Sequence, residues 1–217
     1  MTPRARLVLA DDHELIARGL EKLLMDRYDI LGVAHSGAEL LELLAHETPD
    51  CVLLDISMPD RNGLEILPEL RAVRPNLKVL MLTMYVDRVL ADTALGLGAA
   101  GYVPKDCGVD ELRSAIDEVL AGHIYVSPRI PKHTDRSALK ATHPSLAALT
   151  PRQHEILRLL GEGKSTGGIA DTLHLRTSTV SYHRANIRKK LGIDTEWGLI
   201  RYAVLMRADE AEEEGGD

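Results

Sequence analysis

The first half of the chain alternates short apolar runs with stretches in which apolar residues recur every three or four positions. The short runs are typical of buried strands, and the stretches between them are typical of amphipathic helices that cover a sheet. The candidate strands are Arg6–Ala10, Ile30–Ala34, Cys51–Asp55, Lys78–Thr83 and Gly101–Pro104. The helical patterns cover residues 15–24, 40–44, 64–73, 89–97 and 112–120. This alternation predicts a parallel sheet with helices packed on it.

The number and order of these elements narrow the fold class. Five strands alternating with five helices fit an α/β, flavodoxin-like domain with a five-stranded parallel sheet, which we expect to span residues 1–124. In such sheets ligands bind beyond the carboxyl ends of the strands, so the residues that follow each strand are the first candidates for function.

A linker is expected where the regular pattern stops. Residues 125–148 contain Pro128, Pro131 and Pro144 among scattered basic and hydroxyl residues, a composition typical of a connecting segment. An acidic tail is expected at residues 209–217.

Helical periodicity resumes between these two segments, in residues 149–208. Thr150 is a candidate N-cap, Pro151 suits the first helical position, and Gln153 would complete a capping box. Three further helices are expected at residues 166–174, 177–191 and 195–207. Because the turn at residues 175–176 is short, the pattern predicts a small all-α helix-turn-helix domain.

Charge is distributed unevenly along the chain, whose net charge is -7. Residues 1–124 hold 12 Lys/Arg against 21 Asp/Glu, whereas residues 149–208 hold 10 against 5. We therefore expect only the second domain to meet a polyanion. The two cysteines, Cys51 and Cys107, suit buried thiols of a reducing, cytoplasmic protein. No apolar run approaches the ~20 residues of a membrane span, so no membrane partner is expected.

Polar side chains follow four of the predicted strands. Asp11 and Asp12 come after the first strand, Asp55 ends the third, Thr83 ends the fourth and Lys105 follows the fifth. Crowded carboxylates repel one another unless a cation joins them, and Mg²⁺ is the natural partner beside a phosphoryl group. A carboxylate can accept a phosphoryl group, and Mg²⁺ with Lys105 would offset charge on the transferring oxygens.

These residues stand in motifs that resemble a known family, the receiver domains of two-component response regulators. The motifs are Asp11-Asp12, the run from Asp55 to Glu65 (DISMPDRNGLE), Leu82-Thr83 and the run from Gly101 to Asp106 (GYVPKD). The resemblance implies that Asp55 accepts phosphate from a cognate histidine kinase. It implies that Asp11, Asp12, Asp55 and the backbone carbonyl of Ser57 bind Mg²⁺. It also implies a regulator rather than an enzyme, apart from slow self-dephosphorylation.

By the same resemblance, Lys105 contacts the phosphoryl group and Thr83 forms a switch pair with Tyr102. A Thr83 hydroxyl that hydrogen-bonds a phosphoryl oxygen would vacate space that the Tyr102 ring can fill. Ser57 and Tyr85 lie two residues beyond Asp55 and Thr83, where we expect them to tune the lifetime of the phosphate.

The second domain resembles the NarL/FixJ family, whose helix-turn-helix is of the LuxR type. The motifs are residues 149–157 (LTPRQHEIL), 162–165 (EGKS), 169–170 (IA), 179–183 (TVSYH) and 186–192 (NIRKKLG). The resemblance implies that residues 177–191 form the recognition helix for double-stranded DNA, with Ser181, Tyr182 and Ala185 facing bases. Phosphate or supporting contacts are expected from Lys164, Thr179, Arg184, Arg188, Lys189 and Lys190.

The last helix carries the predicted dimer contact. Trp197, Ile200 and Val204 make it more hydrophobic than a lone surface helix requires, and the resemblance points to a homodimer that forms on activation. A dimer would place two recognition helices about 34 Å apart, one turn of DNA.

Three departures from the family pattern bear on DNA affinity. Gly167 and Gly168 stand where the family has polar or charged residues, and each costs about 1 kcal/mol relative to Ala inside a helix. Arg176 replaces a Ser cap, so the cap is expected to move to Thr177. Ser181 replaces a frequent Lys, which weakens a possible base or phosphate contact.

Two other classes of function compete with this one. A haloacid-dehalogenase-like phosphatase also uses an Asp nucleophile with Mg²⁺, but it needs an acidic proton donor where this chain has Ser57. The basic helix could instead be a solvated face or dock a protein partner, in which case the second domain would be an interaction module without DNA binding.

Overall fold

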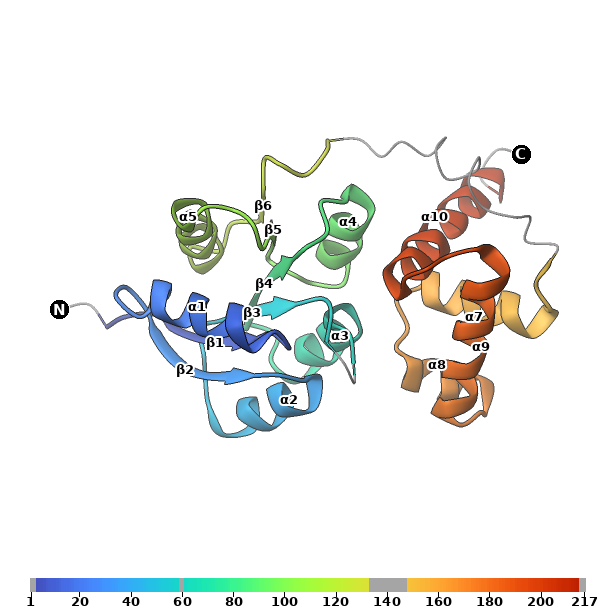
Figure 1. Cartoon of the computed structure of the whole chain (residues 1–217), viewed down its shortest axis with the longest axis horizontal. Coiled ribbons are helices and arrows are strands. Elements are labelled where there is room, and N and C mark those ends of the chain that lie inside the picture. Colours follow the sequence, from blue (N-terminus) through green and yellow to red (C-terminus); the bar gives the residue numbers. More distant parts are fainter. Residues whose placement is uncertain (1–2, 59–60, 133–147, 215–217) are drawn as a thin grey trace. The chain divides into compact units, whose positions relative to one another are not determined.

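Parallel strands and covering helices alternate along the first unit, as the apolar pattern predicts (Figure 1). The chain is described by a computed structural model over residues 3–58, 61–132 and 148–214, and it divides into two units at residues 132/133. The strands are β1 (Arg6–Ala10), β2 (Asp29–Ala34), β3 (Cys51–Asp55), β4 (Lys78–Thr83), β5 (Gly101–Pro104) and β6 (Tyr125–Val126). The helices are α1 (Glu14–Leu24), α2 (Gly37–His46), α3 (Gly63–Val73), α4 (Arg88–Gly96) and α5 (Val109–Leu120).

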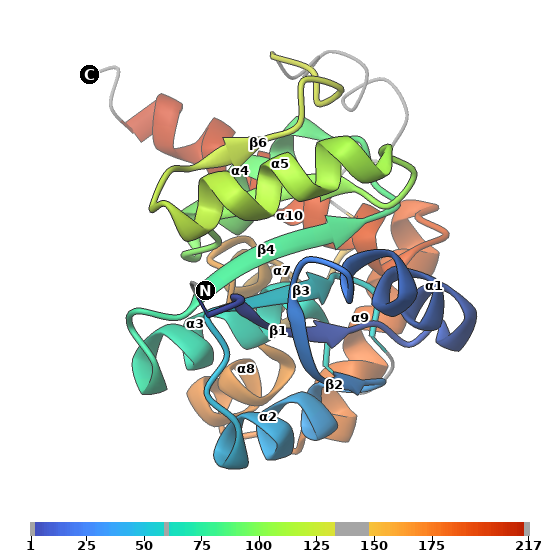
Figure 2. The ribbon, with the colours of Figure 1, turned by 90° about the vertical axis from the view of Figure 1, so that its left-hand side faces the viewer.

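The strands form one parallel sheet in the order β2-β1-β3-β4-β5-β6 (Figure 2). Helices α1 and α5 cover one face, and α2, α3 and α4 cover the other (Figures 1 and 2). Alternate strand residues face opposite sides, so Leu7, Leu9, Leu53, Leu80 and Leu82 share one core with Leu112, Ala115, Ile116 and Val119 of α5. This packing confirms the flavodoxin-like fold class.

The prediction of five strands is wrong by one, because β6 adds a sixth at the β5 edge. Tyr125 donates its backbone N–H to the Ala100 carbonyl, and Ser127 donates to the Tyr102 carbonyl. These bonds satisfy backbone groups that an open edge would leave to water. A strand of two residues has no periodicity to detect, and Pro128 follows it closely, so the sequence pattern is that of a linker.

Side chains beyond β6 fasten the segment further to the first unit. Arg129 pairs with Asp106 through two contacts of 2.7 and 2.8 Å, and the buried Ser127 hydroxyl donates to Glu111. Ile130 is also buried. The beginning of the predicted linker is therefore part of the first unit, while its residues 133–147 lie outside the described residues.

The second unit consists of the predicted helices, α7 (Pro151–Gly161), α8 (Thr166–Leu173), α9 (Thr177–Leu191) and α10 (Glu196–Glu214). One core joins them, with Ile156, Leu160, Ile169, Val180, Ile187, Leu191, Leu199 and Ala203 among its members. The capping box is confirmed: the Thr150 hydroxyl accepts from the Gln153 N–H, and the Gln153 side chain accepts from the Thr150 N–H. Among the described residues, no helix has the length and apolar character needed to span a bilayer.

Two local predictions in this unit are wrong. Helix α9 begins at Thr177 with Arg176 as its N-cap, and no side-chain hydrogen bond caps it, so the cap does not move to Thr177. Helix α10 continues to Glu214 into the predicted acidic tail. The Ala and Glu residues of that segment have high helix propensity, which outweighs their like charges.

Replacing Gly167 by Ala is expected to raise the free energy of unfolding of the second unit by about 0.5–1 kcal/mol, because Ala loses less backbone entropy in a helix. Among the residues that the structure describes, a Cβ there would have only the Ser165 hydroxyl within 4 Å, at 3.8 Å, so no clash offsets the gain. Chemical denaturation followed by the fluorescence of Trp197 measures the change. Gly161→Ala is the contrasting variant, because its Cβ would meet the Ala203 carbonyl oxygen at 2.5 Å and should lower stability.

Candidate functional site

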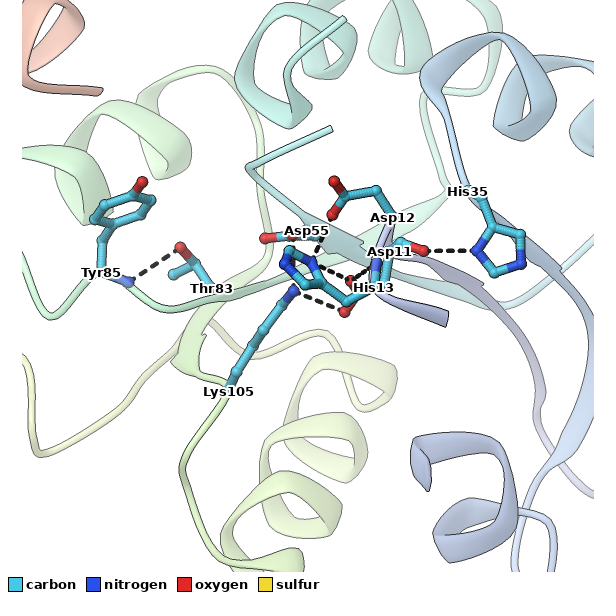
Figure 3. A network of polar contacts seen from close by, with 8 residues as sticks. All are labelled: Asp11, Asp12, His13, His35, Asp55, Thr83, Tyr85 and Lys105. Atoms are coloured by element: carbon cyan, nitrogen blue, oxygen red, sulfur yellow. Dashed lines mark hydrogen bonds and ion pairs between the residues drawn. The ribbon is translucent and has the colours of Figure 1, made fainter. Parts of the chain in front are cut away.

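Three ionic side chains meet at the carboxyl ends of β1, β3 and β5 (Figure 3). Lys105 lies between two carboxylates, with its Nζ 2.7 Å from Asp11 Oδ2 and 2.8 Å from Asp55 Oδ2. All three side chains are at most 4% exposed. Because parallel strands end at one edge of a sheet, residues far apart in sequence come together, as the strand-end argument predicts.

Asp12 and His13 join Asp11 and Asp55 in a group that could hold a metal ion. One ligand atom from each of the four lies within 4.8 Å of the others. His13 Nδ1 is 2.7 Å from Asp12 Oδ1 and 3.4 Å from Asp11 Oδ1. Carboxylate oxygens are the ligands that Mg²⁺ prefers, and the single charge of Lys105 cannot balance three carboxylates. Both the donor set and the local charge therefore fit a divalent cation.

The environment of Asp55 alters its acidity. Burial raises the pKa of its carboxyl above the ordinary value, and the hydrogen bond and charge of Lys105 reverse this only in part. A backbone hydrogen bond from Ser57 also lowers the pKa, whereas the negative charge of Asp11 raises it. Ionisation of Asp55 therefore destabilises the fold as the pH rises through the raised pKa, and a bound cation would favour the ionised, nucleophilic form.

Ser57 is brought to the site through its backbone. Its N–H is the group that hydrogen-bonds the Asp55 carboxylate, and its side chain is half-buried. The carbonyl of Ser57 as a metal ligand stays a prediction.

Thr83 and Tyr102, the predicted switch pair, are both fully buried and are linked through Tyr85. The Tyr102 hydroxyl donates to the Tyr85 carbonyl at 2.9 Å, and the Tyr85 N–H donates to Thr83 Oγ1 at 3.2 Å (Figure 3 shows the second bond). Burial raises the pKa of Tyr102 above its ordinary value, and the negative charge of Asp87 adds to this rise. The predicted switch moves the Tyr102 ring inward when Thr83 moves, whereas in this structure the ring already lies inside.

Gly63 at the start of α3 allows close contact with the strand that carries Asp55. Its N–H donates to the Ile56 carbonyl at 2.9 Å, and the neighbouring Asn62 caps α3 by accepting from Glu65 N–H. A Cβ on Gly63 would lie 2.3 Å from the Asp55 carbonyl oxygen. Only glycine fits this contact, which sets the backbone position of Asp55.

The predicted recognition helix, α9, presents most of its predicted DNA-contacting residues to solvent. Tyr182 is 66% exposed, and Ser181, Ala185, Lys189 and Lys190 are exposed too. Arg188, Lys164 and Thr179 are partly exposed. Two of the lysines are also bonded within the unit, Lys190 to the Gln153 side chain and the Ala148 carbonyl, and Lys164 to Thr172.

Arg184 departs from the prediction that it approaches a DNA phosphate. It is 6% exposed, its Nε donates to Glu196 Oε1 at 2.6 Å, and its guanidinium also contacts Thr166. A charge in the core is retained only with a counter-charge, which Glu196 supplies. Arg184 therefore joins α9 to α8 and α10 and leaves the set of surface cations.

The predicted dimer residues of α10 are mostly buried and do not form a freely exposed contact surface. Trp197 and Ile200 are buried, and Val204 is half-buried. The dimer contact at these three residues stays a prediction.

Two residues of these sites, His13 and Glu196, are not among those that the sequence motifs predict. His13 follows the Asp11-Asp12 pair directly, so its place beside the carboxylates could have been inferred from adjacency. Glu196 meets Arg184 and Arg188 across the α9–α10 turn, at a separation for which helical periodicity gives no signal.

Two protein-family descriptions match the chain. Residues 7–117 match the response regulator receiver domain, and residues 147–203 match the bacterial regulatory proteins of the luxR family. The first match contains the carboxylate site, and the second contains α7, α8 and α9.

Individual relatives agree with both matches. The chain is 37% identical over 204 residues to the transcriptional regulatory protein MctR of Rhizobium johnstonii, covering 93% of this chain and 94% of that one. It is 35% identical over 195 residues to the DNA-binding transcriptional activator DevR/DosR of Mycobacterium tuberculosis, covering 87% and 89%.

Solved structures give the same picture. A LuxR-family response regulator from an Aurantimonas species is 32% identical, with a TM-score of 0.57 and coverage of 58% of this chain and 92% of that chain. RcsB of Salmonella enterica serovar Typhimurium, solved on promoter DNA with the phosphomimetic BeF3-, has a TM-score of 0.56 at 24% identity over 94% and 100% of the chains. At that identity the likeness extends to the fold alone.

Proposed function

The chain belongs to the two-component response regulators with a LuxR-family DNA-binding domain, and we propose that phosphoryl transfer to Asp55 controls how it binds DNA. The observation that carries this proposal is the buried group of Asp11, Asp55 and Lys105. It holds a nucleophilic carboxylate beside a fixed cation at the sheet edge where ligands bind.

In the proposed transfer, an Asp55 oxygen attacks the phosphorus of a phosphohistidine on the cognate histidine kinase. The new O–P bond forms as the N–P bond breaks, and the imidazole leaves with the electron pair. Asp11 and Asp12 with Asp55 would hold Mg²⁺, which offsets charge on the transferring oxygens when bound. Lys105, now shared between Asp11 and Asp55, would turn to a phosphoryl oxygen.

The proposed signal leaves the site through Thr83. Its hydroxyl accepts the Tyr85 N–H, and exchanging that bond for one to a phosphoryl oxygen would shift Tyr85. The Tyr85 carbonyl accepts the Tyr102 hydroxyl, so the same shift changes what holds the buried ring. We therefore place the bistable part of the switch in the Tyr85 backbone, with Tyr102 responding to it.

The proposed signal changes how α9 contacts DNA. We propose that Ser181, Tyr182 and Ala185 face base edges, where their hydroxyl and methyl groups can bond to or pack against bases. Phosphate contacts would come from Lys164, Thr179, Arg188, Lys189 and Lys190. A homodimer formed through α10 would bring two such helices to successive turns of the duplex. The DNA-bound RcsB structure supports this by analogy of fold.

The deciding experiment uses beryllofluoride with Mg²⁺ as the phosphoryl mimic on the full chain. We expect the mimic to raise the sedimenting mass of the wild type toward a dimer and to tighten its binding to duplex DNA from its own upstream region. The Asp55→Asn variant should show neither effect. If mass, shape and DNA affinity of the wild type stay the same with the mimic, control by phosphorylation is wrong. If no DNA shift occurs even at low salt, the second domain is an interaction module.

A further inference from the structure

One carboxylate, that of Glu196 at the start of α10, faces two arginines of the recognition helix. Its Oε1 accepts from Arg184 Nε at 2.6 Å, and its Oε2 lies 3.5 Å from Arg188 Nε. Arg184 and Arg188 are one helical turn apart, so both side chains leave the same side of α9. The two cations thus compete for a single anionic group.

The two arginines are held very differently. The Arg184 side chain is 7% exposed and also contacts Thr166, so its charge has no access to DNA. The Arg188 side chain is 31% exposed. Within the described residues, Arg188 Nε makes no hydrogen bond despite facing the carboxylate, and its Nη1 donates to the Asp194 carbonyl at 3.2 Å. Arg184 is a structural cation, and Arg188 is a loosely held one.

From this asymmetry we infer that Glu196 is a positioning residue that occupies Arg188 in place of a DNA phosphate and so weakens DNA binding. A phosphate and a carboxylate offer a guanidinium the same pattern of acceptor oxygens, so one can exchange for the other. On DNA, Arg188 turns outward to a phosphate while Glu196 stays with Arg184. The buried pair keeps α9 in place throughout the exchange. This inference rests on the proposed phosphate contact of Arg188.

The central variant is Glu196→Gln in the full chain, which keeps an acceptor for Arg184 but removes the charge that attracts Arg188. The probe is a fluorescein-labelled DNA duplex of arbitrary sequence, titrated at several salt concentrations and followed by anisotropy. We expect binding to tighten roughly three- to tenfold at low salt, and the slope of log affinity against log salt to steepen by about 0.9, the value of one more phosphate contact.

Two controls separate this mechanism from a general change of charge. Glu162→Gln removes the same charge from the exposed Arg158–Glu162 pair of the neighbouring α7, and it should leave the salt slope unchanged. In an Arg188→Ala background, Glu196→Gln should no longer tighten binding. If the gain matches that of Glu162→Gln, or persists without Arg188, or is absent, the inference is wrong.

Folding and the proposed function are checked in the same series. If Glu196→Gln unfolds below the working temperature, the double variant R184M/E196Q takes its place with the same expectation, since it leaves no buried charge unpaired. A wild type that fails to bind the duplex even at low salt would overturn the proposed function and, with it, this inference. A wild type that binds while Glu196→Gln equals it would overturn the inference alone.

Discussion

Asp55→Asn is expected to abolish phosphoryl uptake from a small-molecule donor such as acetyl phosphate in the presence of Mg²⁺. The amide is a very poor nucleophile toward phosphorus, and no other carboxylate of the site replaces it. Asp11 and Asp12 are expected to remain ligands of Mg²⁺ and not to accept the phosphoryl group. The substituted amide retains an oxygen that can accept from Lys105, so the site should keep its fold. Intact-protein mass spectrometry measures the phosphorylated fraction directly.

The matched control is Asp92→Asn, which makes the same chemical change in the exposed Arg88–Asp92 pair of α4. It should take up phosphate as the wild type does. Phosphorylation of Asp55→Asn to the wild-type level would show that another side chain is the acceptor. The role assigned to the Asp11, Asp55 and Lys105 group would then be wrong.

Gly63→Ala is expected to lower the free energy of unfolding of the first unit by about 1–3 kcal/mol, the usual cost of overpacking a filled region. The added methyl would lie 2.3 Å from the Asp55 carbonyl oxygen and 3.1 Å from Ile56 Cα, both backbone atoms that cannot turn away. Displacing the Asp55 backbone also misplaces its carboxylate, and a shift of about 1 Å can cost roughly 100-fold in rate. Denaturation curves and initial rates of phosphorylation give the two values.

Gly19→Ala serves as the control for that variant. Gly19 lies inside α1, and a Cβ there would meet nothing within 4 Å in the described part of the chain. The substitution should therefore raise stability slightly and leave the phosphorylation rate unchanged. Equal behaviour of the two alanine variants would contradict the view that contact with Gly63 sets the position of Asp55.

The parallel sheet and the residues at its active edge could be predicted from sequence because both depend on local signals. Each strand is an apolar run with a polar end, and the fold brings those ends together. The β6 strand could not be predicted in this way. The strand is defined by two backbone hydrogen bonds, one to Tyr102 of β5 and one to Ala100, which precedes β5. Nothing in the sequence of a two-residue segment near a proline distinguishes a strand from a linker.

The burial of Arg184 could have been predicted from its spacing along the helix, but its residue type suggested a surface cation instead. Val180, Arg184, Ile187 and Leu191 follow the spacing of one helix face, and the other three are fully buried core residues. The spacing alone would have placed Arg184 inside and required a counter-charge. It could not name Glu196, because the two residues meet only after the chain has turned between α9 and α10.

Likewise, the motif around Tyr102 predicts a switch role for this residue but not the position of its ring. Whether the ring lies inside depends on the Tyr85 carbonyl, which is positioned by the backbone of the β4–α4 loop. Residue patterns carry no direct information on where such a loop places a carbonyl oxygen.

The β6 strand also determines where evolution or an engineer can recombine this protein. A junction placed at residue 124 would cut the pairing of Tyr125 and Ser127 with the β5 edge and would discard the buried Ile130 and the Arg129–Asp106 pair. A receiver excised there would offer its β5 edge to other chains, a known route to aggregation. A junction after Lys132 keeps the first unit whole. Chimeras that exchange DNA-binding modules between family members should therefore keep residues 125–132 with the receiver unit.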